Sequence, residues 1–79
     1  MYMNNNYVTK DLYLSAYLII KGQKFKMNKE GKTVNFEFTM TDEIMYYVNE
    51  YLMGNGSCEP LSFTNAIKNI KNLIYNNSL

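Results

Sequence analysis

Histidine and tryptophan are absent from the sequence, and cysteine and proline occur once each among its 79 residues. Because Cys58 is the single thiol, no disulfide can form within the chain, and one thiol without histidine cannot build a zinc site. A Ser-His or Cys-His catalytic arrangement is excluded as well. We therefore predict a protein that is not an enzyme and that has no cofactor and no metal.

Long apolar runs are also missing. No run approaches the roughly 18 residues that a membrane-spanning helix needs, and residues 1–7 lack the basic and then apolar order of a secretory signal. The net charge of +1 argues against a general polyelectrolyte binder. With 47% apolar residues, the chain suits a folded domain, and we predict a cytoplasmic one without membrane contact. Its predicted limits are residues 9–76, between a flexible arm at 1–8 and a frayed tail at 77–79.

The strongest local pattern is an alternation of apolar and polar residues. Phe25 and Met27 alternate with lysines, and residues 34–40 alternate between apolar and polar side chains. This period of two predicts a β-hairpin over about residues 23–39. Between the strands, Asn28-Lys29-Glu30-Gly31 is typical of a type I turn followed by a left-handed glycine.

Three helices are predicted around this hairpin, which gives an α+β fold in the order helix, hairpin, helix, helix. The first helix covers about residues 10–21, with Thr9 as its N-cap, and the second follows Thr39 or Thr41 and ends at Gly54. Ser62 is expected to cap the third helix. The second helix has one apolar face, made of Ile44, Val48, Tyr51 and Leu52, and the apolar stripe of the third contains Phe63, Ala66, Ile67, Ile70, Leu73 and Ile74.

The first helix is unusual because Ser15 is the only polar residue between Leu12 and Ile20. A helix that is apolar on every side must be buried on every side. Two interpretations remain open. Either this helix is central and the other elements surround it, or one of its faces forms the seam of a homodimer. A dimer would also help so small a chain, since ordering costs roughly 1.5 kcal/mol per residue.

Charge is unevenly distributed along the chain. A basic cluster lies on the hairpin, at Lys24, Lys26, Lys29 and Lys32, whereas residues 37–59 hold five acids and no lysine. The basic cluster could contact a nucleic-acid backbone. We favour the alternative, in which these lysines are the solvated edge that deters strands from aggregating.

Residues 9–18 read Thr-Lys-Asp-Leu-Tyr-Leu-Ser-Ala-Tyr-Leu and are followed by Lys21-Gly22. The hairpin ends in Asn-Phe-Glu-Phe at residues 35–38, and Pro60 precedes the last helix. In these features the chain resembles, over about residues 8–75, a family of short phage and bacterial proteins catalogued as a domain of unknown function. The resemblance implies a phage or mobile-element setting, and it supplies no activity, substrate or catalytic residue.

From these observations we expect a small non-catalytic protein-interaction module that binds another protein, such as host machinery, or pairs as a homodimer. The expected contact residues are Tyr13, Tyr17, Ile20 and Tyr46, because tyrosine is enriched at interfaces. The alternative is a small nucleic-acid-binding accessory or regulatory protein that uses the hairpin lysines.

Overall fold

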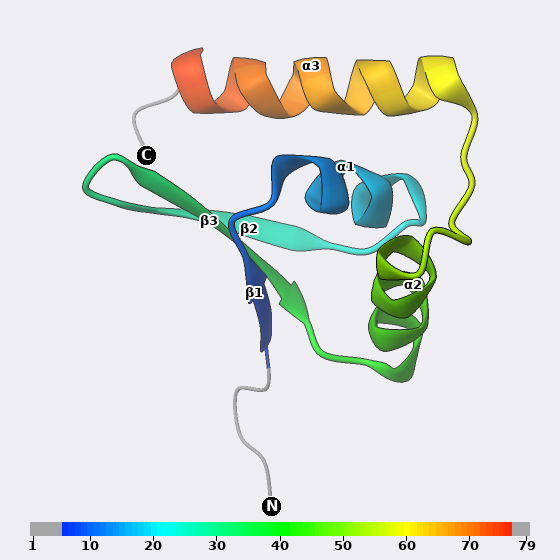
Figure 1. The fold of residues 1–79 in the computed structure, drawn as a ribbon. Coiled ribbons are helices and arrows are strands. Elements are labelled where there is room, and N and C mark those ends of the chain that lie inside the picture. Colours follow the sequence, from blue (N-terminus) through cyan, green and yellow to red (C-terminus); the bar gives the residue numbers. More distant parts are fainter. Residues whose placement is uncertain (1–5, 77–79) are drawn as a thin grey trace, which may run out of the picture.

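The computed structural model describes residues 6–76, which form three helices and a three-stranded antiparallel sheet (Figure 1). The elements follow the order β1 (Asn6–Thr9), α1 (Leu12–Ile20), β2 (Phe25–Glu30), β3 (Thr33–Thr39), α2 (Asp42–Leu52) and α3 (Pro60–Asn76). In Figure 1, α1 lies between α3 and the strands, and α2 lies to one side. The predicted α+β class and element types are confirmed. The predicted tail at 77–79 lies outside the described residues, as does the arm at 1–5.

The predicted hairpin is confirmed, although its turn differs. β2 pairs with β3 in a continuous register from Phe25↔Phe38 to Glu30↔Thr33. The turn therefore consists of Gly31 and Lys32, and the four-residue turn predicted at 28–31 is wrong. Gly31 has a φ of +61°, the left-handed conformation that two-residue hairpin turns need and that glycine adopts at little cost.

A third strand was missed by the sequence analysis. Residues 6–8, which we placed in the flexible arm, form β1 together with Thr9 and pair with β3 from Asn6↔Thr39 to Thr9↔Phe36. The strand order is β1-β3-β2. Without β1, one side of the largely buried strand β3 would lack partners for its N–H and C=O groups, and unpaired buried backbone groups are costly. That requirement explains why a short, asparagine-containing segment becomes a strand.

The start of α1 is two residues later than expected. Asp11, and not Thr9, is the N-cap, and its carboxylate Oδ1 accepts hydrogen bonds from the backbone N–H groups of Tyr13 and Leu14, each at 3.0 Å. Thr9 is occupied as the last residue of β1. Its Oγ1 still contributes, because it accepts a hydrogen bond from the Asp11 N–H at 3.1 Å.

Of the N-caps predicted for the other two helices, one is confirmed and one is wrong. Thr41 caps α2 as predicted, since its Oγ1 accepts from the Ile44 N–H at 3.1 Å. α3 begins at Pro60, and its first turn is held by the Glu59 carboxylate, which accepts from the Ser62 N–H at 2.7 Å. Ser62 is therefore not the cap. Proline favours the first helical position because its fixed φ suits a helix and its missing N–H is not needed there.

The core lies where α1 meets the other elements. Its buried apolar side chains come from α1 (Leu14, Ala16, Tyr17 and Leu18), β3 (Phe36 and Phe38), α2 (Ile44 and Val48) and α3 (Ile70). Ser15 is buried as well, and its Oγ donates a hydrogen bond to the Asp11 carbonyl oxygen at 2.8 Å. Five consecutive residues of α1, 14–18, are thus buried within one chain. The central-helix interpretation therefore describes residues 14–18, whereas Tyr13 is exposed and Ile19 and Ile20 are half-buried.

Candidate protein-interaction surfaces

Tyr17, which we predicted as an exposed contact, is 2% exposed. Its hydroxyl donates to Glu50 Oε1 of α2 at 3.3 Å. On the same side, a Cβ placed on Gly56 would lie 2.8 Å from the Tyr17 hydroxyl oxygen. The prediction for Tyr17 is therefore wrong, because its long side chain reaches from α1 to the loop after α2 and fills the space between them.

The environment of Tyr17 also fixes its protonation. Burial raises the pKa of the Tyr17 hydroxyl, and the nearby carboxylate of Glu50 raises this pKa further. The group therefore stays neutral and serves as a hydrogen-bond donor. This arrangement is structural, since it ties α1 to α2.

Aromatic rings pack against one another where α1 contacts α2. The ring centroid of Tyr17 lies 5.4 Å from that of Tyr51 and 6.5 Å from that of Tyr47. The Lys21 Nζ lies 5.3 Å from the Tyr17 ring centroid and 5.8 Å from that of Tyr47, within the range of a cation–π interaction. Lys21 therefore contacts the tyrosines between α1 and α2 and does not belong to the group of hairpin lysines.

The other three predicted contact residues have different neighbours. Tyr13 is 51% exposed, and its ring lies 6.4 Å from that of Phe63 on α3. Ile20 is half-buried at the end of α1. Tyr46 is 60% exposed on α2, where a hydrogen bond to Glu50 raises the pKa of its hydroxyl. Tyr13 and Tyr46 are accessible as predicted, and they lie on separate helices.

Exposed apolar side chains gather on α2 and at its C-cap, Met53. Met45, Tyr46, Leu52 and Met53 are 38%, 60%, 66% and 72% exposed, and we call this set the outer face of α2. Leu52 was predicted to lie on the buried face, and this prediction is wrong. On a helical wheel Leu52 falls about 40° beyond Val48, next to Met45, so it lies just past the edge of the buried stripe.

All four hairpin lysines of the nucleic-acid hypothesis are exposed. They do not share one face, because alternate residues of a strand point to opposite sides. Lys26 and Lys29 lie on opposite sides of β2, Lys24 precedes the strand, and Lys32 is in the turn. A straight basic track along the hairpin is therefore not formed.

The acids of the hairpin are bonded to amides. Glu37 accepts a hydrogen bond from Asn28 Nδ2, and Glu30 accepts one from Asn35 Nδ2, each at 2.9 Å. These bonds connect neighbouring strands across the outer side of the sheet. They leave the lysine ammonium groups of the hairpin facing solvent.

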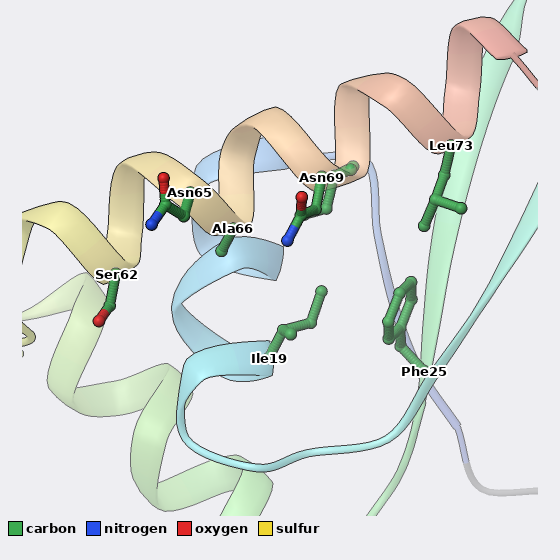
Figure 2. A pocket seen from close by; sticks show the side chains of 8 residues that line it. Ile19, Phe25, Ser62, Asn65, Ala66, Asn69 and Leu73 are labelled. Atoms are coloured by element: carbon green, nitrogen blue, oxygen red, sulfur yellow. The ribbon is translucent and has the colours of Figure 1, made fainter.

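A cavity of about 460 Å³ opens between α3, the end of α1 and the start of β2 (Figure 2). Its lining is largely apolar, with three small polar side chains along α3. The lining residues are Ile19, Phe25, Ser62, Asn65, Ala66, Asn69, Ile70 and Leu73. In Figure 2, Ala66, Asn69 and Leu73 lie on the side of α3 that faces Ile19 and Phe25. The sequence analysis missed this cavity because three separate segments form it.

Within residues 6–76, no three or more Cys, Asp and Glu side chains are grouped so that they could hold a metal ion. Cys58 is half-buried in the loop between α2 and α3. In the same described part of the chain, every helix is too short or too polar to cross a membrane.

Together these features define a small α+β domain that keeps an apolar helix face and a basic hairpin exposed. The chain belongs to the family described as a domain of unknown function (DUF5659), whose model matches residues 4–76. The resemblance to such a family is thereby confirmed, while the phage or mobile-element setting stays a prediction. No curated protein and no solved structure matches the chain.

Proposed function

We propose that this protein is a small non-catalytic interaction module that binds another protein through the outer face of α2. The observation that supports this function is the exposure of Met45, Tyr46 and Leu52 on α2 and of Met53 at its C-cap. Burying apolar surface contributes about 25 cal/mol per Å². Methionine side chains adapt to irregular partner surfaces, and tyrosine is common among residues that dominate binding energy.

Charge around this face defines the chemistry of the partner. Asp42 and Glu43 are exposed at the start of α2, Glu50 lies in its last turn, and residues 37–59 contain no lysine. A complementary surface has an apolar centre and a basic border. A second copy paired symmetrically through α2 would bring these acids together, so we propose a different protein as the partner of this face. The setting that the resemblance implies makes a host protein the expected partner.

Site-specific photo-crosslinking tests this proposal. A crosslinking amino acid is placed at Met53 or, as the matched control, at Leu61, which is 63% exposed on α3. In an extract of the cells that produce the chain, we expect one partner to crosslink at position 53 and not at 61. Its contact surface should carry lysine or arginine around an apolar centre. Equal crosslinking at both positions would contradict the proposal.

The variant Met53→Lys provides the second arm of the test. We expect it to abolish capture of the partner by placing a cation against a basic border, and to change the free energy of unfolding by less than about 0.5 kcal/mol. Light scattering over a range of concentrations should show a monomer for both proteins. A dimer of the wild-type chain that Met53→Lys dissociates would identify a second copy as the partner instead.

A further inference from the structure

β2 has a free edge. Among the described strands it pairs with β3 alone, because the strand order is β1-β3-β2. In a hairpin with a two-residue turn, the residues that flank the turn, here Glu30 and Thr33, form a hydrogen-bonded pair, and the pattern then alternates. Phe25, Met27 and Lys29 consequently direct their N–H and C=O groups toward the free edge. These groups are able to bond to an added strand.

The cavity under α3 lies at the beginning of this edge. Phe25, the first residue of β2, lines it together with Ile19, Ile70 and Leu73, and Asn65 and Asn69 lie along its α3 side (Figure 2). An added strand would present alternate side chains on the face of the sheet that carries Phe25 and Met27. Apolar side chains at those positions would enter the cavity.

The other face of β2 carries positive charge. Lys26 is exposed there, and Lys24 is exposed immediately before the strand; in the added strand the side chains opposite Lys26 and Lys24 would be those between the apolar ones. Glu37, which is paired with Lys26 across the ladder, is bonded to Asn28. Charge complementarity therefore favours acidic residues in the partner.

We propose that the free edge of β2 binds an extended acidic segment of a partner protein as a fourth strand. Apolar side chains of that segment fill the cavity under α3, and the intervening carboxylates contact Lys24 and Lys26. This site goes beyond the proposed function: it lies on other elements than the outer face of α2 and selects the opposite charge. The main-chain bonds supply affinity, and the alternation of the segment supplies specificity.

The probe for this site is a fluorescein-labelled peptide of alternating glutamate and valine or leucine residues. Its control has the same composition, with the acidic and apolar residues in separate blocks. We expect fluorescence anisotropy to show binding of the alternating peptide about tenfold tighter than that of the block peptide, and weaker binding as salt is added. Equal affinity for both peptides, or no binding of the alternating one at millimolar concentration, would overturn the proposal.

Two pairs of variants locate the site. Lys26→Glu should weaken binding about tenfold, whereas Lys68→Glu, the same charge change on the exposed side of α3, should leave it unchanged. Lys29→Pro removes an edge N–H outside the β2–β3 ladder and should abolish binding, while Lys29→Thr keeps it. Chemical shifts of the hairpin amides confirm that each variant is folded. If Lys29→Pro unfolds the hairpin, the comparison of the two peptides decides alone.

A single-stranded oligonucleotide is the third ligand to test. Binding of the oligonucleotide that Lys26→Glu weakens and Lys29→Pro leaves intact, without peptide binding, would assign the basic hairpin to nucleic acid and overturn the peptide site.

Discussion

Helices α1 and α2 are both rich in tyrosine and aliphatic residues, but they are buried to very different extents. α1 buries five consecutive residues, 14–18, whereas α2 buries Ile44 and Val48, and α2 together with its C-cap Met53 exposes four large apolar side chains. α1 lies between α3 and the sheet, and α2 has a neighbour on one side (Figure 1). The comparison shows that position among the elements decides how much of an apolar helix remains available for a partner.

The largest expected difference is between matched leucine truncations on the two helices. Leu18 is 0% exposed and Leu52 is 66% exposed. We expect Leu18→Ala to lower the free energy of unfolding by about 2–5 kcal/mol, because it leaves a cavity in the core, and Leu52→Ala to lower it by less than about 0.5 kcal/mol. Urea denaturation measures both. Similar costs for the two variants would break the comparison.

A smaller effect is expected where the loop after α2 closes over α1. Gly56→Ala would place a Cβ 2.8 Å from the Tyr17 hydroxyl oxygen and 2.9 Å from its Cζ. Displacing this buried ring should cost about 1–3 kcal/mol. In a Tyr17→Leu background the same substitution should cost less, because the shorter side chain leaves room. Asn55→Ala, at the exposed neighbouring position, should be nearly neutral. The measurement is thermal or urea unfolding of all variants.

The smallest effect concerns the hydroxyl pKa values of Tyr17 on α1 and Tyr46 on α2. Burial is the main cause of the raised pKa of Tyr17, and hydrogen bonding to Glu50 is the main cause for Tyr46. Glu50→Gln should therefore return the pKa of Tyr46 toward its ordinary value and leave that of Tyr17 raised. Titration of the tyrosine Cζ signals by NMR measures both. If the pKa of Tyr17 also returns to normal, the carboxylate and not burial controls it.

The raised pKa of Tyr17 also has a consequence for stability. Because the folded state holds this proton more tightly than the unfolded state, the contribution of Tyr17 is complete below the ordinary tyrosine pKa of about 10. It is lost as the pH rises toward the higher pKa of the folded state. The free energy of unfolding should accordingly decrease as the pH rises above about 10. The decrease should be smaller in Tyr17→Phe, which has no hydroxyl to titrate.

Much of the fold could be predicted because local chemistry determines it. The alternation around Phe25 and Phe36 defines the hairpin, and Gly22, with a φ of +87°, follows the end of α1 as expected. β1 could not be predicted, because its four residues carry little pattern and its formation depends on the needs of β3. The turn was misplaced because Asn28 and Gly31 also fit a longer loop.

The candidate surfaces were less predictable than the fold. The exposure of Tyr46 could be read from its side of the helical wheel, but the burial of Tyr17 depends on Gly56, which lies in a distant loop. Leu52 was assigned to the wrong side because the wheel does not show how wide the covered stripe is. The cavity beside Phe25 requires the direction of α3, which no local pattern contains.

The enclosure of α1 has a consequence for how the protein is made. Ile70, which packs in the same core as α1, belongs to the last helix, α3. β1 can pair only after residues 36–39 of β3 have been synthesised. During synthesis β1 and α1 leave the ribosome before β3, α2 and α3, and until then they are without most of their partners. A product terminated before α3 would leave this apolar helix partly uncovered, and we expect chaperones and proteases to recognise it.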